Sequence, residues 1–233
     1  MLLPEAGLDW TETVLAPESR ATKGVPEATP DEPLATRILL GGPVCRPLHA
    51  DAVDDPGVAA TLTTERDASD YTMVDLGVTF NPADGERIQN AWVQVMLSVP
   101  AGIEPAIAWS MTPERLASPD LLTTEIEVRT DLKILSLGAK TSRAVTRQDT
   151  FLQALNPLRA DPTWEFSRTS SAEIVGALRM ALMVRSAVGS PVRGALRMVA
   201  VIRRKRFKAI PYTVLAADGN HTPEAGAVMF DVR

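Results

Sequence analysis

The chain has 233 residues, nearly half of them apolar, with a formal net charge of −5 and a single cysteine. This composition is sufficient for a folded core, and one cysteine excludes an internal disulfide. The first residues lack the basic and apolar regions of a secretory signal, and no apolar run reaches the ~20 residues of a membrane-spanning helix. We therefore expect a soluble, cytoplasmic protein.

Charge is distributed unevenly along the chain. Acidic residues outnumber basic residues over residues 1–70, whereas Glu173 is the single acidic residue among many basic ones in residues 167–210. Such a division indicates either an internal contact between the two segments or a basic surface for an anionic partner. The alternative explanation is that the basic residues only keep one face of a strand solvated.

Residues 1–70 are rich in proline, acidic residues, threonine and alanine. Few segments of this kind bury enough apolar surface to offset the entropy lost on ordering. We predict a mostly irregular N-terminal arm over residues 1–70, in which Leu34–Leu40 could dock as a short strand. Cys45 and His49 in this arm could form a nucleophile–base pair, but their spacing in a proline-rich segment favours a chance arrangement.

An ordered domain is predicted over residues 71–233, because apolar and polar residues alternate there in short segments. Alternation with a period of two is typical of strands that bury one face. Strands are expected at residues 74–80, 91–99, 106–111, 125–134, 141–155, 164–166, 207–215 and 228–232. Thr112 and Pro113 are expected to open one helical turn. The pattern predicts an all-β fold, an antiparallel β-sandwich of about seven to nine strands.

The most informative pattern is the pair of alternating segments Glu173–Arg185 and Gly194–Arg206, which a short break containing Gly189 and Pro191 separates. Two such segments predict an antiparallel hairpin with one buried face. Its inward side chains are expected to be Leu178, Met180, Leu182, Leu196 and Met198. Trp164 and Phe166 are also expected to pack between the sheets.

The candidate partner-binding residues are the basic side chains of this hairpin and one tryptophan. They are Arg179, Arg197, Arg203, Arg204, Lys205, Arg206, Lys208 and Trp92. Basic clusters contact phosphates and other anions, although charged strand ends also discourage edge-to-edge aggregation. Trp92 lies among the polar residues that alternate with the apolar ones of its strand, so it is expected on the outer face. Tryptophan and arginine are frequent hot spots of protein interfaces.

No combination of residues predicts a catalytic site, a cofactor site or a metal site. Two distant histidines and one cysteine give no metal-ligand spacing. We therefore expect a non-enzymatic structural or protein-interaction module that binds other proteins, including copies of itself, within a homo-oligomer or a larger assembly. The basic hairpin face could bind an anionic partner, and no strong signal for nucleic acid or membrane is present.

Two alternatives belong to other functional classes. A membrane-active protein of the pore-forming type would use the 173–206 hairpin as spanning strands. A hydrolase would use strand carboxylates such as Glu125 or Glu127. The alternation of these two residues with basic residues is more typical of a cross-strand charge ladder.

Overall fold

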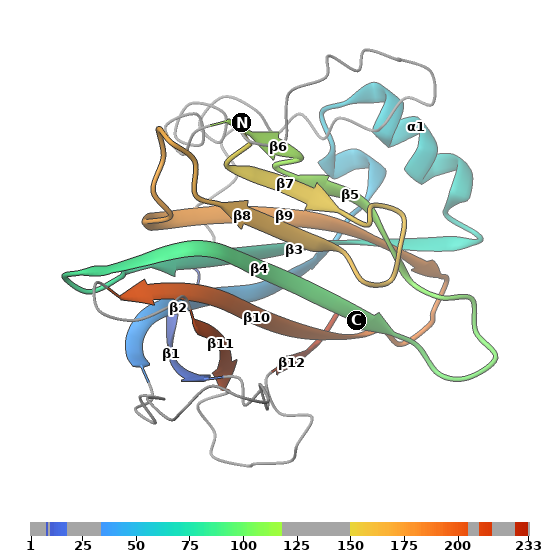
Figure 1. The fold of residues 1–233 in the computed structure, drawn as a ribbon. Helices are drawn as coiled ribbons and strands as arrows, with labels where there is room; N and C mark the ends of the chain where they lie inside the picture. The colour runs from blue at the N-terminus through green and yellow to red at the C-terminus, as the bar shows by residue number, and fades with distance from the viewer. Residues whose placement is uncertain are drawn as a thin grey trace.

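The computed structural model describes residues 8, 10–17, 34–117, 150–204, 210–215 and 227–232. These residues form strands, one short 3-10 helix and one α-helix (Figure 1). The strands are β1 (Trp10–Pro17), β2 (Leu34–Pro47), β3 (Ser69–Phe80), β4 (Glu86–Ser98), β5 (Ile107–Thr112), β6 (Arg115–Leu116), β7 (Leu152–Leu155), β8 (Thr163–Ser167), β9 (Gly176–Ala187), β10 (Arg193–Arg204), β11 (Ile210–Leu215) and β12 (Ala227–Asp231). The helices are η1 (Ala50–Ala52) and α1 (Pro56–Glu65).

The strands form two antiparallel layers, which confirms the predicted all-β sandwich. The described residues form twelve strands, more than the predicted seven to nine. One layer has the order β5-β9-β3-β2. The other has the order β10-β4-β8-β7-β6, with β12 beside the first half of β10. β1 and β11 pair with each other and connect β2 to β10, so the two layers are joined along one side.

The hairpin predicted for residues 173–206 is wrong. β9 pairs with β3 along its whole length and also with β5, whereas β10 pairs with β4, β11 and β12. The turn at Gly189 therefore carries the chain from one layer to the other. Alternation reveals which face of a strand is buried, but it does not reveal which strand lies beside it. The membrane-active alternative loses the paired strands on which it was based.

Side chains of the two layers face each other and form the main core. The inward residues predicted for β9 and β10 are all buried, namely Leu178, Met180, Leu182, Leu196 and Met198. Phe80 of β3 and Phe166 of β8 meet edge to face, with ring centroids 5.2 Å apart, so aromatic packing bridges the layers. Trp164 is buried as predicted, and its Nε1 donates to the carbonyl oxygen of Pro113 at 3.2 Å.

The strands predicted near residues 74–80 and 91–99 are present as β3 and β4, with the expected side chains inward. In β5 the pairing with β9 shifts, and this bulge buries Ala108 and Met111 while Trp109 stays only half-buried. The helical turn predicted to begin at Thr112 is wrong, because the chain passes from β5 into the short strand β6. Apolar spacing cannot show a bulge, which changes the phase inside one strand.

The mostly irregular structure predicted for residues 1–70 is wrong for the described part of that segment. β2 pairs with β3, and its residues Ile38 and Leu40 are buried in the main core. Two of the prolines occupy positions that regular structure tolerates: Pro56 is the first residue of α1, and Pro43 lies at a bulge of β2. Composition averages over a segment and so misses these individual positions.

α1 lies on the outer face of the four-stranded layer (Figure 1). Its residues Val58 and Leu62 form a second small core with Tyr71 of β3 and Met183 of β9. Neither helix in the described part of the chain is long and apolar enough to cross a membrane.

The last predicted strands are present in part. β7 covers the end of the strand predicted at residues 141–155, and β8 contains the strand predicted at residues 164–166. β11 and β12 overlap the strands predicted at residues 207–215 and 228–232. The strand predicted at residues 125–134 lies outside the described residues, and so do Glu125 and Glu127 of the hydrolase alternative.

Candidate interaction surfaces

The predicted partner-binding arginines do not share one face. Arg179 lies on the outer face of the four-stranded layer, whereas Arg197 and Arg203 lie on the outer face of β10 in the other layer. All three residues are exposed. The other predicted basic residues follow at the end of β10 and beyond it: Arg204, Lys205, Arg206 and Lys208. The last three lie outside the described residues.

Trp92 lies on the outer face of β4, as its parity predicts, and is half-buried. Its cross-strand neighbours are Val199 of β10 and Glu165 of β8. The indole Nε1 donates to Oε1 of Glu165 at 3.3 Å, which satisfies its polar edge and holds the ring. A side chain that is held in this way loses little conformational entropy when a partner binds.

Two exposed methionines on the same outer face as Trp92 carry no signal in the sequence. Met96 of β4 and Met229 of β12 flank Ala195 of β10 in direct cross-strand register. Met96 is 36% exposed and Met229 is 64% exposed, so the two methionines present apolar side chains to solvent on either side of the buried Ala195. We name the outer-face residues Trp92, Met96, Ala195, Arg197 and Met229 the β10 face. Only strand register, which pattern analysis does not provide, brings these residues together.

Two arginines oppose each other beyond the β10 face. Arg203 of β10 pairs in register with Arg87 of β4, and both are exposed. Like charges directly opposite each other destabilise a sheet. The nearby carboxylate of Glu173 accepts two hydrogen bonds from Arg168, which lower its pKa together with the charges of Arg168 and Arg87. Arg87 therefore has a carboxylate in its field, and Arg168 binds the same carboxylate directly.

The outer face of the four-stranded layer is partly covered. α1 packs over Tyr71 and Met183. Farther along, the ring of Trp10 lies against Gly41 of β2 and Gly77 of β3, which face each other in register. A Cβ atom at Gly77 would lie 2.7 Å from the Trp10 ring, so the missing side chain makes this close approach possible.

Arg185 ties α1 to this layer. Its Nε donates to Oε2 of Glu65 and to Oγ of Ser69, each at 3.1 Å, and its guanidinium lies 5.5 Å from the ring centroid of Trp109. The hydroxyl of Tyr71 donates to the same Glu65 oxygen at 2.7 Å. Burial, followed by this hydrogen bond, raises the pKa of Tyr71. Arg185 therefore has a structural role, although the alternation of its strand places it among the outward-facing residues.

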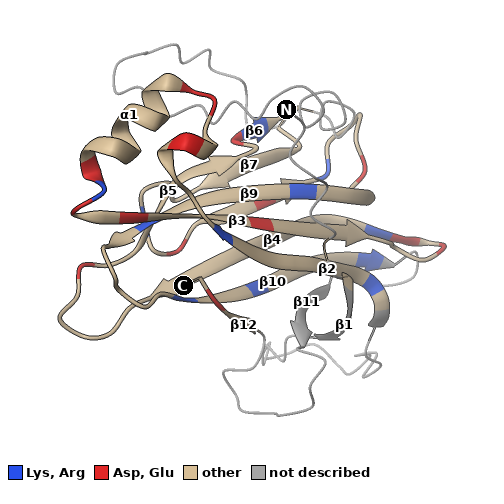
Figure 2. Cartoon of the chain, turned by 180° about the vertical axis from the view of Figure 1, so that it is seen from behind, with Lys and Arg blue, Asp and Glu red and all other residues tan. Residues whose placement is uncertain are grey.

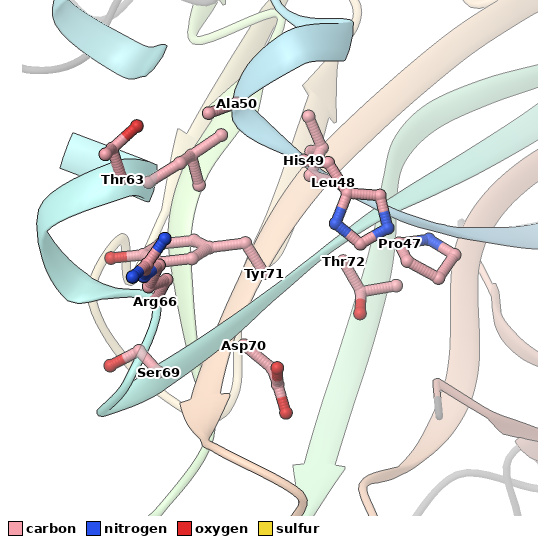
Figure 3. Close-up of a pocket in the computed structure, with 11 residues that line it drawn as sticks. Pro47, Leu48, His49, Ala50, Thr63, Arg66, Ser69, Asp70, Tyr71 and Thr72 are labelled. Atoms are coloured by element: carbon pink, nitrogen blue, oxygen red, sulfur yellow. The ribbon is translucent and has the colours of Figure 1, made fainter. Parts of the chain in front are cut away.

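A hollow of about 500 Å³ lies beside α1, η1 and the start of β3 (Figure 3). His49 and Thr72 line one side, and Arg66 lies across from them. The carboxylate of Asp70 also lines the hollow, but its Oδ2 accepts the N–H of Gly189 at 2.6 Å. Asp70 thus holds the turn between β9 and β10, which is a structural role.

Cys45 does not form a nucleophile–base pair with His49. Cys45 lies in β2 with its side chain against the main core, whereas His49 is exposed beyond the end of that strand. Burial, with the charges of Asp75 and Asp231, raises the pKa of the Cys45 thiol to about 11. A nucleophilic cysteine needs the thiolate form, which this environment disfavours.

The described residues contain no group of three or more His, Cys, Asp or Glu side chains that could hold a metal ion. Neither a protein-family model nor a curated protein matches the chain.

Proposed function

We propose that this protein is a non-enzymatic structural or interaction module of the cytoplasm, and that it binds other proteins within a homo-oligomer or a larger assembly. The β10 face is the observation that carries this proposal. It brings the half-buried Trp92 and the exposed Arg197, Met96 and Met229 to one outer face, and these residue types are enriched at protein interfaces. This face is built on paired strands and is therefore rigid before binding.

The surroundings of the β10 face support the same proposal. The next cross-strand row consists of Ser98, Arg193 and Asp231. Arg193 and Asp231 are both strongly exposed and approach to 3.8 Å. A polar, solvated row beside an apolar strip is typical of the rim and the centre of a protein interface.

The proposal is tested by the native mass of the full chain, tagged and expressed at its normal level in its own cells. We expect the wild-type protein in complexes heavier than a monomer. Changing Arg197→Glu and Met229→Glu together replaces a positive charge and an apolar side chain on the β10 face with two negative charges. We expect this variant to be released from the complexes.

A matched control changes Leu158→Glu and Arg159→Glu, since these residues are exposed between β7 and β8, outside the β10 face. The control should stay in the complexes. A monomeric wild-type protein, or complexes that tolerate the change at the β10 face, would contradict the proposal.

A further inference from the structure

We propose that two copies of this chain pair edge to edge through strand β12, in antiparallel orientation, so that one sheet continues from one molecule into the other. This inference deepens the proposed function and rests on its premise that the chain associates with copies of itself. It adds the partner, which is one second copy, and the strand register of the contact.

The outer edge of β12 carries the inference. In the part of the chain that the structure describes, β12 has one strand neighbour, β10. The N–H of Val232 donates to the carbonyl oxygen of Val192 at 2.9 Å, so these two residues form a hydrogen-bonded pair. Such pairs alternate along an antiparallel ladder, which makes Phe230 and Val228 the next residues of β12 bonded to β10. The other residues of β12 direct their backbone groups away from β10: Ala227, Met229 and Asp231.

The inner face of β12 is anchored to the sandwich. Val228 and Phe230 pack against the main core. The ring of Phe230 covers Gly194, its cross-strand neighbour on β10, and a Cβ atom at Gly194 would overlap this ring. An edge that is fixed in this way is ordered before a partner binds, so pairing costs little conformational entropy.

β12 lacks several features that commonly prevent edge strands from pairing, namely lysine, proline and bulges. Its sequence is Ala-Val-Met-Phe-Asp, and its pairing with β10 shows no shift of register. Its one charged residue, Asp231, lies at its end (Figure 2). The centre of the strand is therefore suited to accept another strand.

The register of β12 favours a second copy as that strand. Met229 is the central residue of β12 and one of the three that point outward, so β12 can pair with itself around a two-fold axis at Met229. Met229 then lies opposite Met229 of the second copy, and Ala227 lies opposite Asp231. Every outward residue gains a partner, and no like charges oppose each other.

The outer face also becomes continuous across the two copies, because directly opposed side chains lie on the same face of a sheet. The exposed Met229 of each copy would contact the other at the axis, with Met96 farther out on each side. The Arg193–Asp231 pair of each copy, at 3.8 Å, would flank this apolar centre. An apolar centre between polar rows is typical of protein interfaces.

The test measures the mass of the purified full chain by sedimentation equilibrium over a range of concentrations. We expect a reversible monomer–dimer equilibrium without larger species. A two-fold contact uses the β12 edge of both copies, so the dimer leaves no such edge open.

Proline at the axis tests the backbone contact. Met229→Pro removes the outward N–H, whereas the N–H groups that bond β10 belong to neighbouring residues, and edge strands tolerate proline at such positions. Met229→Ala is the matched control, since it removes the same side chain and keeps the N–H. We expect Met229→Pro to dimerise about tenfold or more weakly than Met229→Ala, because the dimer loses two hydrogen bonds and the proline rings enter the space between the strands.

Charged side chains at the axis test the register. Met229→Lys or Met229→Glu alone places like charges directly opposite each other, and each should weaken dimerisation about tenfold. An equimolar mixture of the two variants should restore a dimer, because lysine then faces glutamate. Met96→Lys is the control and should leave the dimer intact, since Met96 lies on the same outer face but β10 separates it from β12.

Several results would overturn the inference. One is a wild-type chain that stays monomeric at the highest concentration measured, and another is a dimer that Met229→Pro weakens no more than Met229→Ala. A third is association that Met96→Lys weakens as much as Met229→Lys, which would place the contact on the β10 face instead. If circular dichroism shows that Met229→Pro does not fold, the mixture of Met229→Lys and Met229→Glu decides, and its failure to dimerise overturns the register.

The proposed function is judged separately, by the native complexes. A purified chain that stays monomeric but still enters heavy complexes in its own cells would contradict the pairing of β12 and leave the proposed function standing. A purified chain that dimerises through β12 while its native complexes tolerate the change at the β10 face would do the reverse.

Discussion

Gly77 allows Trp10 to lie on the outer face of β3. A Cβ at this position would come within 2.7 Å of the Trp10 ring and 2.9 Å of Cδ1 of Leu8. We expect Gly77→Ala to lower the free energy of unfolding by about 1–3 kcal/mol, as in overpacked sites. The measurement is urea unfolding of the full chain.

A second variant isolates the Trp10 contact. In a Trp10→Ala background the same Gly77→Ala change should cost less, because the added methyl group then meets Leu8 but no longer meets the ring. An equal cost in both backgrounds would mean that the Gly77 effect arises elsewhere, for instance from the strand backbone.

Cys45 supplies a test of the core environment of β2. Its thiol pKa of about 11 lies two units above the ordinary value of 9.0. At pH 8 the thiolate fraction should therefore be roughly a hundredfold below that of an ordinary cysteine, and alkylation by iodoacetamide should be correspondingly slow. The rate should rise as the pH approaches 11.

The same pKa shift affects stability with a definite sign. The unfolded chain releases the Cys45 proton at lower pH than the folded chain, so folding loses stability as the pH rises from about 9 to 11. Urea-unfolded protein is the control for alkylation and should react at the ordinary rate. Equal rates for folded and unfolded protein at pH 8 would be inconsistent with a protected thiol.

At the scale of elements, α1 depends on the cap that precedes it. Oδ1 of Asp55 accepts hydrogen bonds from the backbone N–H groups of Gly57 and Val58, at 2.7 and 3.0 Å. We expect Asp55→Ala to cost about 1 kcal/mol of stability and to increase hydrogen exchange within α1. Asp55→Asn keeps an acceptor and should cost less. If exchange in α1 were unchanged in Asp55→Ala, the side chain would have no capping role.

The strands also show which features of the fold can be predicted from the sequence. Alternation correctly assigned the buried faces of β9 and β10, because a period of two follows directly from strand geometry. The neighbours of these strands remained hidden, since pairing depends on contacts between distant segments. For the same reason Trp92 was identified from its own parity, whereas its companions Met96 and Met229 required the register. The short strand expected at Leu34–Leu40 is part of the longer strand β2.

At the scale of the whole molecule, the segment before residue 71 belongs to the fold. β2 is the neighbour of β3, and Ile38 and Leu40 each bury a side chain worth about 1.5–3 kcal/mol. We expect a chain of residues 71–233 to lose cooperative unfolding, because marginal stability does not tolerate this loss. Circular dichroism during urea titration provides the measurement.

A chain of residues 34–233 is the matched control, since it keeps β2 and α1 and removes residues 1–33, which include β1. We expect it to retain a cooperative transition. A cooperative transition of residues 71–233 at the wild-type midpoint would restore the interpretation of the first 70 residues as a dispensable arm.

The pairing of β3 with β9 and of β4 with β10 has a consequence during synthesis. Val78 pairs with Leu178, and Val93 pairs with Met198, so each partner strand is translated about 100 residues after the first. Ribosomes add about 5–20 residues per second, which leaves β3 and β4 without these partners for several seconds. During that interval the emerging chain exposes strands destined for the core, and it should depend on chaperones that bind nascent polypeptides.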